Sequence, residues 1–268
     1  MKDKILLFIP MYNCEKQITR VLRQIDEEVA QYITEVIVVN NRSTDNGEKA
    51  VSELIDSSSI PVPVRLFRND DNYGLGGSHK VAFGYAIENG FDYVIVLHGD
   101  DQGAIKDYLP ALKSGDYQNY DCYLGARFMK GALLKGYSKI RIWGNYVFNG
   151  LFSLVVGRKV YDLGSGLNMY KVEPLKGKYY TSFPDTLYFN DCMILAYVFY
   201  KQKIKFVPIT WREEDQVSNN KLIRFSISLL KMLFNYKKNK DAYIHSEMRA
   251  KVIDEYTYTV VCEKGYSK

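Results

Sequence analysis

The segment YVIVLHGDDQ, residues 93–102, gives the clearest indication of the fold. Residues 93–97 are continuously apolar and run into a polar turn that contains a glycine, which is typical of a strand buried on both faces. In open α/β sheets, ligands bind at the carboxyl ends of the strands, where this turn would lie. The turn is therefore the first candidate for a functional site.

The turn carries side chains that suit a hard divalent cation. His98, Asp100 and Gln102 alternate, so in an extended backbone they would converge on one ion, while Asp101 would point elsewhere. Such a cation takes mostly oxygen ligands and commonly bridges to a substrate phosphate. The turn predicts a metal–diphosphate site, and the alternative is an acidic turn exposed to solvent.

Strands and helices alternate through the first hundred residues. Apolar runs predict strands at residues 5–9, 36–39, 60–67 and 93–97, and apolar residues at helical spacing predict helices between them, the first over residues 15–30. This order predicts an α/β, Rossmann-like fold with a mostly parallel central sheet and helices on both faces.

A glycine-rich turn, Gly74-Leu75-Gly76-Gly77, opens the helix that follows the third predicted strand. It matches neither the dinucleotide fingerprint nor the Walker A motif, because it lacks the Gly-Lys-Ser/Thr ending and does not follow the first strand. It predicts either a tight turn with close helix packing or a direct ligand contact through Gly76.

Composition narrows the function classes. The 268 residues carry a net charge of +5, and the basic residues are scattered, which argues against a nucleic-acid partner and still allows an anionic one. The four cysteines form no CxxC pair, which favours a reducing compartment. The sequence shows no signal peptide and no apolar span of about 20 residues. We therefore expect a cytoplasmic protein, peripheral on the cytosolic face of a membrane.

Two amphipathic helices are predicted in the second half, over residues 138–157 and 222–236. Lys237, Lys238 and Lys240 follow the second helix, and an apolar face with basic edges suits a bilayer interface. We expect at least one helix to touch a membrane; the alternative is that both pack in the core. The predicted organisation is a globular domain over residues 1–220 and an amphipathic helix with a tail over residues 221–268.

Five short motifs, taken in order, resemble the family 2 glycosyltransferases of GT-A fold, in particular the dolichyl- or polyprenyl-phosphate sugar synthases. They are PMYN at residues 10–13, VNNRSTD at 39–45, HGDDQ at 98–102, GARF at 125–128, and Asp162 with SGL at 165–167. The resemblance covers about Lys4 to Tyr236 and makes residues 1–220 a GT-A glycosyltransferase domain. It implies metal-assisted, inverting transfer of a sugar from a nucleoside diphosphate sugar, with Mn²⁺ or Mg²⁺ as cofactor.

The resemblance also implies site residues. Those expected to bind the nucleotide sugar are Pro10, Tyr12, Asn13, Val39, Asn40, Asn41, Gly76, Gly99, Asp100, Arg127 and Arg212. The expected metal ligands are Asp100 and Gln102 with His98, and the expected catalytic residues are Asp100, Arg127 and Asp191. The two arginines are candidates for phosphate contacts because the guanidinium group matches that geometry.

Several positions depart from the family pattern, and three of them are expected site residues. Asn40 and Asn41 stand where the family has aspartates that hold the base or ribose, and because an amide both donates and accepts hydrogen bonds, the nucleotide base is left open. His98 replaces the first metal aspartate, which removes a charge and makes Mn²⁺ relatively more acceptable.

The acceptor decides whether a general base is needed. A lipid phosphate is already ionised, whereas a sugar hydroxyl needs a base, for which Asp191 is the candidate; Asp191 could instead cap its helix. The amphipathic helices favour a polyprenyl phosphate acceptor, and Asp191 favours a hydroxyl in glycan assembly. The competing classes are a sugar-nucleotide pyrophosphorylase, whose glycine-rich loop after the first strand is missing here, and an inactive membrane-associated scaffold.

Overall fold

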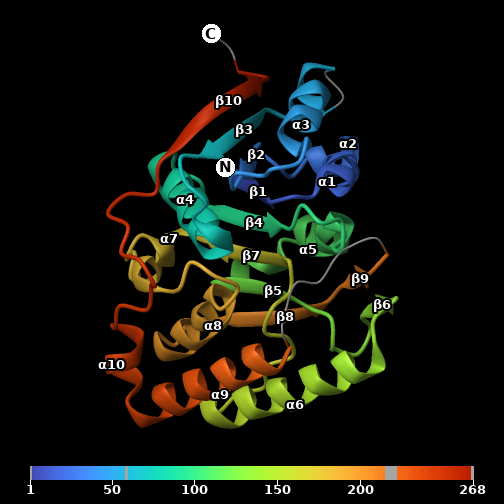
Figure 1. Ribbon diagram of the computed structural model, residues 1–268. Coiled ribbons are helices and arrows are strands. Elements are labelled where there is room, and N and C mark those ends of the chain that lie inside the picture. The colour runs from blue at the N-terminus through green and yellow to red at the C-terminus, as the bar shows by residue number, and fades with distance from the viewer. Residues whose placement is uncertain (1, 58–59, 215–221, 267–268) are drawn as a thin grey trace.

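An eight-stranded sheet lies at the centre of the molecule (Figure 1). The computed structural model describes residues 2–57, 60–214 and 222–266. The sheet has the strand order β10-β3-β2-β1-β4-β7-β5-β8, and β6 pairs with β9 beside it. The strands are β1 (Ile5–Met11), β2 (Glu35–Asn40), β3 (Val64–Asn69), β4 (Tyr93–Leu97), β5 (Cys122–Ala126), β6 (Leu133–Lys135), β7 (Leu167–Lys171), β8 (Ile204–Pro208), β9 (Thr210–Arg212) and β10 (Tyr258–Lys264).

Helices cover both faces of this sheet. One face is covered by α1 (Glu15–Leu22), α2 (Glu27–Ala30), α3 (Gly47–Asp56) and α5 (Leu109–Ser114). The other is covered by α4 (Gly74–Glu88), α6 (Lys139–Val156), α7 (Val172–Leu175), α8 (Phe189–Phe199), α9 (Leu222–Lys238) and α10 (Lys240–Ile244). Three 3₁₀ helices, η1 (Ile105–Tyr108), η2 (Asp116–Asn119) and η3 (Tyr179–Ser182), complete the helical elements of the described chain.

Four of the seven strand pairings in the central sheet are parallel. The antiparallel pairs join β4 with β7, β5 with β7, and β3 with β10. The prediction of a mostly parallel sheet covered by helices on both faces is confirmed.

The first strand shows why continuous apolar runs mark the central strands. Leu6 and Phe8 point into the hydrophobic core on the α4 side, whereas Ile5, Leu7 and Ile9 point into the core on the α1 side. Successive side chains of a strand face opposite sides, so a strand between two helical layers must be apolar at every position.

The helix predicted over residues 15–30 is wrong in its middle. α1 ends at Leu22, and α2 begins only at Glu27. The carboxylate of Asp26 accepts hydrogen bonds from the backbone N–H groups of Glu28 and Val29, at 3.2 and 3.1 Å, and so starts a separate helix. The predicted helix over residues 138–157 is confirmed as α6.

Part of the region predicted as a tail is built into the central sheet. β10 pairs antiparallel with β3, with Tyr258 opposite Asn69 and Lys264 opposite Val64. Figure 1 shows this segment, in red, running from α10 past α4 to the edge of the sheet. Among the helices that the structure describes, none has both the length and the hydrophobicity needed to span a bilayer.

Candidate active site

A pocket of about 390 Å³ opens at the carboxyl ends of β1 and β4. Ligand sites are commonly concave, with volumes of about 300–1,000 Å³, so this pocket has room for a small ligand. Its lining includes six residues singled out from the sequence, which are Pro10, Tyr12, Asn41, His98, Gly99 and Asp100. The turn after β4 therefore lies in a concave site, as its position at the strand ends predicts.

The two aspartates of this turn have separate surroundings. Asp100 lines the pocket, whereas Asp101 adopts a left-handed backbone (φ 58°) and its buried carboxylate pairs with two arginines. Arg20 Nε donates to Asp101 Oδ2 at 2.7 Å, and Arg212 Nε donates to the Asp101 carbonyl at 2.8 Å while its Nη2 pairs with Oδ1. Arg212 is thus held by the turn itself.

The three predicted metal ligands are only partly brought together. His98 and Asp100 line the pocket, and Gln102 is not among its lining residues. The backbone N–H of Gln102 donates to Asp100 Oδ1 at 3.2 Å, so the turn closes on itself. In the described chain, no three His, Cys, Asp or Glu side chains are grouped so that they could hold a metal ion.

Burial controls the charges of the pocket residues. Desolvation raises the pKa of Asp100 to about 6, against hydrogen bonds from backbone N–H groups that favour the ionised form. Desolvation and the nearby Arg127 lower the pKa of His98 to about 4. At neutral pH the site therefore holds an ionised carboxylate beside a neutral imidazole. The buried Nε2 atom of His98 has no hydrogen-bond partner among the described residues.

Asn41 forms one wall of the pocket and also organises it. Its Oδ1 accepts hydrogen bonds from the Tyr73 backbone N–H at 2.8 Å and from Asn69 Nδ2 at 2.9 Å. Its Nδ2 donates to Asn72 Oδ1 at 2.8 Å. An amide serves here because the position needs a donor as well as an oxygen that accepts two hydrogen bonds, and an ionised carboxylate has no donor.

Four predicted nucleotide-sugar residues lie beside the pocket without lining it. Asn40 donates to Glu48 Oε2 at 2.7 Å and accepts from the Ser43 N–H, while Asn13 accepts from the Thr44 N–H at 2.7 Å. Val39 is fully buried in the core. At Gly76, a Cβ would lie 2.3 Å from the Pro184 carbonyl oxygen, so the missing side chain permits close packing of the chain.

Arg127 is held in a buried ion pair with Asp162. Its Nε and Nη2 atoms donate to the two carboxylate oxygens at 2.8 and 2.7 Å, and its backbone N–H donates to Oδ2 at 2.8 Å. The guanidinium carbon also lies 4.9 Å from the Trp211 ring centroid. The bidentate geometry fixes the plane of the guanidinium group.

Asp191 lies in the first turn of α8 and is buried. Desolvation and the nearby charge of Asp162 raise the pKa of the Asp191 carboxyl well above its usual value. A hydrogen bond from the backbone N–H of Asp191 itself acts in the opposite direction, because it favours the ionised carboxylate. A buried carboxyl group with a raised pKa fits the chemistry of a general base, although Asp191 is not among the residues that line the pocket.

The sequence matches the family model described as glycosyl transferase family 2 over residues 7–177, more than half of the chain. The chain belongs to glycosyl transferase family 2. It is 26% identical over 186 residues to the UDP-N-acetylglucosamine–dolichyl-phosphate N-acetylglucosaminyltransferase of Methanococcus voltae, covering 66% of this chain and 73% of that protein. It is 22% identical over 214 residues to the undecaprenyl-phosphate mannosyltransferase of Micrococcus luteus, covering 79% and 85%.

Solved structures support the GT-A fold of this glycosyltransferase. One is glucosyl-3-phosphoglycerate synthase from Mycobacterium tuberculosis in complex with Mn²⁺, UDP-glucose and phosphoglyceric acid. It superposes with a TM-score of 0.60 at 17% identity, covering 88% of this chain and 80% of that chain. The predicted family, fold and enzyme class are therefore confirmed.

The candidate pocket offers two groups that fit a divalent cation. They are the ionised carboxylate of Asp100 and the imidazole of His98, whose Nε2 has no other partner in the described structure. A cation in phosphate-processing sites is commonly held by one or two protein ligands and completed by substrate phosphates. A nitrogen ligand suits Mn²⁺ better than Mg²⁺.

Sequence reasoning missed several residues of the candidate site. Asn72, Leu75, Ser78, Thr186 and Leu187 all line the pocket. Leu75 belongs to the glycine-rich turn, and Asn72 and Ser78 flank it. The turn indicated these residues only by its position before a helix. Thr186 and Leu187 precede α8, and no local pattern marks them as neighbours of β1 and β4.

Proposed function

We propose that this enzyme transfers a sugar from a nucleoside diphosphate sugar to a polyprenyl phosphate at the cytosolic face of a membrane, with inversion of the anomeric centre. The relatives named for dolichyl and undecaprenyl phosphate support this acceptor class. The observation that carries the proposal is an exposed apolar surface formed by α6 and α9.

α6 keeps an apolar stripe in solvent. Ile140, Trp143 and Leu154 are 79%, 70% and 81% exposed, and Val147 between them is also exposed. Their spacing of three, four and seven residues places them along one face of the helix. The opposite stripe, which includes Phe152 and Val156, is buried in the core.

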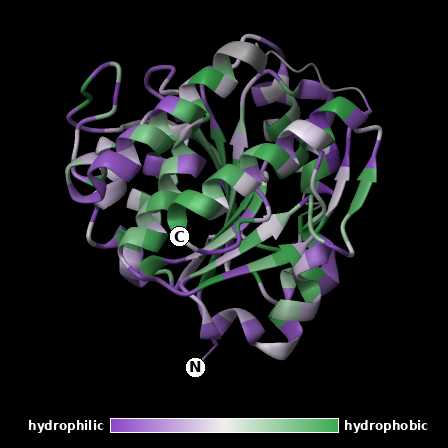
Figure 2. Cartoon of the chain, turned by 90° about the horizontal axis from the view of Figure 1, so that it is seen from below, coloured by the Kyte–Doolittle hydropathy of each residue, from purple (hydrophilic) through white to green (hydrophobic). Residues whose placement is uncertain are grey.

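α9 repeats this arrangement beside α6. Ile227, Leu230 and Phe234 are exposed at the same helical spacing, while Leu229, Met232, Leu233 and Tyr236 are buried. The two helices contact each other and form the lowest layer in Figure 1, and hydrophobic residues lie along the helices seen from below in Figure 2. Two exposed apolar stripes on neighbouring helices mark an interaction surface.

Basic residues border this surface. Lys139 begins α6, and Lys231, Lys237 and Lys238 lie on or end α9, all of them exposed. Near an anionic bilayer, each lysine adds about 1 kcal/mol of attraction. Apolar stripes with cationic edges suit a helix pair that lies in the lipid interface and so gives the enzyme access to a lipid acceptor.

The pocket residues supply binding and orientation for the donor. Tyr12 is half exposed and can stack on a nucleobase, and Asn41 presents an ordered amide wall. Asp100 and His98 would hold a Mn²⁺ or Mg²⁺ ion, which when bound supplies positive charge for the leaving diphosphate. An ionised lipid phosphate attacks C1 of the sugar from the face opposite the diphosphate, and the bond from C1 to the diphosphate oxygen breaks. The anomeric centre is therefore inverted. Because the phosphate is already ionised, this step needs no proton acceptor.

An acceptor competition tests the proposal. The full chain with Mn²⁺ is given labelled UDP-glucose, UDP-N-acetylglucosamine or GDP-mannose, together with undecaprenyl phosphate in vesicles or a soluble oligosaccharide. We expect label to enter the lipid fraction with one of the donors. Label that enters only the oligosaccharide would reject the lipid phosphate acceptor.

A second candidate is transfer to a sugar hydroxyl in glycan assembly, with Asp191 as base. The burial of Asp191 favours it, because a carboxylate whose pKa is raised accepts a hydroxyl proton more readily. Asp191→Asn separates the two candidates. Transfer to a lipid phosphate should survive this substitution within a fewfold, whereas transfer to a hydroxyl should fall by about 100-fold or more.

A further inference from the structure

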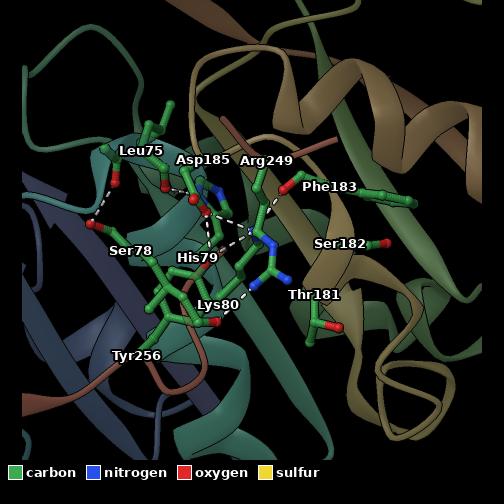
Figure 3. Close-up of polar contacts among 12 residues, drawn as sticks. Leu75, Ser78, His79, Lys80, Thr181, Ser182, Phe183, Asp185, Arg249 and Tyr256 are labelled. Carbon is green, nitrogen blue, oxygen red and sulfur yellow. Dashed lines mark hydrogen bonds and ion pairs between the residues drawn. The ribbon is translucent and has the colours of Figure 1, made fainter. Parts of the chain in front are cut away.

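Lys80 is a buried lysine on α4 whose ammonium group joins three parts of the chain (Figure 3). Its side chain is 2% exposed. Nζ donates to the Phe183 carbonyl at 2.6 Å, to Asp185 Oδ1 at 2.6 Å and to Tyr256 Oη at 3.1 Å. All three donors of the ammonium group are therefore used, which is what a buried charge requires.

The segment that follows α10 closes over this group. Tyr256 Oη donates to Asp185 Oδ1 at 2.8 Å, and the Met248 backbone N–H donates to the Ser182 carbonyl at 2.8 Å. Arg249 stiffens the segment, because its Nη1 donates to the Ile253 carbonyl at 2.7 Å. Residues 246–257 therefore form a strap across the linker between η3 and α8.

The linker between η3 and α8, residues 183–188, also packs against the glycine-rich turn. The Gly76 N–H donates to the Asp185 carbonyl at 2.8 Å. A Cβ at Gly74 would lie 2.3 Å from that carbonyl oxygen, and a Cβ at Gly76 would lie 2.3 Å from the carbonyl of Pro184. The linker is thus fixed by the turn on one side and by Lys80 and the strap on the other.

The fixed linker leads directly into the pocket wall. Thr186 and Leu187, the residues after Asp185, line the pocket, and Asp191 follows in the first turn of α8. Lys80 itself is not among the residues that line the pocket.

We propose that Lys80 is a positioning residue for sugar transfer. Together with Asp185 and Tyr256 it sets the place of the pocket wall at Thr186 and Leu187 and of the head of α8. The strap of residues 246–257 then helps to keep the pocket wall in the position that sugar transfer needs. This inference rests on the glycosyltransferase activity and is independent of the acceptor.

The test compares Lys80→Met with Arg65→Met. Methionine has a similar length to lysine and supplies none of the three donors. Arg65 is a matched control, because it also joins a partly buried network, with Glu35, Glu263 and Tyr85, but it lies near the amino end of β3, away from the pocket. Tyr256→Phe is a milder variant, and Lys80→Arg restores a cation.

Three measurements are made on each full-length variant: the melting temperature, kcat and KM with the donor that the wild type uses, and hydrogen exchange of residues 183–191. We expect Lys80→Met to lower kcat at least tenfold and to speed exchange in that segment, Tyr256→Phe to do so to a smaller degree, and Lys80→Arg to recover part of kcat. Arg65→Met should lower the melting temperature while kcat changes less than twofold and exchange at 183–191 is unaltered.

Equal losses of kcat in Lys80→Met and Arg65→Met would overturn the proposal, as would unchanged exchange at 183–191 in both Lys80→Met and Tyr256→Phe. If the wild type turned over no donor, the proposed function would fail, and the exchange measurement would still decide whether Lys80 positions the linker.

Discussion

The carboxylate of Asp162 holds the guanidinium of Arg127 by two parallel hydrogen bonds inside the protein, with N···O distances of 2.8 and 2.7 Å. The two side chains are 1% and 10% exposed. Arg127 was expected to contact the donor diphosphate, and that role stays a prediction. In the described structure its charge is already matched by a residue of its own chain.

Removing one partner of this pair should be costly. We expect Asp162→Asn to lower the free energy of unfolding by about 3 kcal/mol, because it leaves a buried guanidinium without its counter-charge. The double variant Arg127→Met with Asp162→Asn should lose less than the sum of the single losses. Urea denaturation of the wild type, Asp162→Asn, Arg127→Met and the double variant measures these losses, and additive losses would contradict the coupling.

Asp100→Ala tests the ionised carboxylate of the pocket. We expect transfer to fall by at least about 100-fold, because Asp100 faces the pocket and would hold the cation that offsets leaving-group charge. The fold should persist, since the side chain lines a cavity. Kinetics with Mn²⁺, together with circular dichroism, check both statements. As an independent readout, the thermal stabilisation of the wild type by Mn²⁺ with the nucleoside diphosphate of its donor should be lost; full activity would reject the assignment.

Because His79 is buried, we expect the folded protein to lose stability in acid. Burial lowers its pKa to about 3, partly against a hydrogen bond to the Leu75 carbonyl, whereas a histidine in the unfolded chain titrates near 6.5. Between pH 6.5 and about 3, the histidine therefore binds a proton in the unfolded state and stays neutral in the folded state. The contribution of neutral His79 is complete above pH 6.5 and is lost as the pH falls toward 3, by up to about 1.4 kcal/mol per pH unit.

His79→Leu should remove this part of the acid sensitivity. Compared with the wild type, the variant should gain relative stability as the pH falls from 7 to 4, whatever the substitution costs at pH 7. Urea unfolding at several pH values measures the difference. Parallel stability profiles of the two proteins would show that His79 does not titrate as its burial requires.

The apolar surface on α6 and α9 predicts membrane binding that depends on single side chains. Trp143→Ser and Phe234→Ser should each weaken binding to anionic vesicles by about tenfold, because each removes a large ring that would be buried in the lipid interface. Val260→Ser is the control, since Val260 is exposed on β10, far along the sheet. Vesicle flotation gives the affinities, and equal effects of all three substitutions would contradict a specific lipid-facing surface.

The sequence pattern predicted those features of the fold and site that depend on residues close together in the chain. The buried strand at residues 93–97, the helix over residues 139–156 and the position of Asp100 in a pocket follow from periodicity and from the rule that ligands bind at strand ends. The break between α1 and α2 was missed because the apolar spacing continues across it, whereas the cap at Asp26 overrides it.

The pairings that organise the site are remote in the chain, and no local pattern could predict them. Asp101 was expected only to point away from the metal site, yet it pairs with Arg20 and Arg212, which are 81 and 111 residues away in the sequence. No local pattern marks Lys80, and only the folded chain shows that its ammonium group donates hydrogen bonds to Asp185 and Tyr256. Such contacts depend on how distant segments cross, which spacing along the chain does not encode.

The antiparallel pairing of β10 with β3 also bears on aggregation. Without β10, the outer edge of β3 would present a row of unpaired N–H and C=O groups, which is a template for association with other chains. Truncation before Tyr258 should therefore yield a protein that is prone to self-association as well as less stable. In this enzyme, a strand from the end of the described chain occupies the edge of β3, which would otherwise be open to other chains.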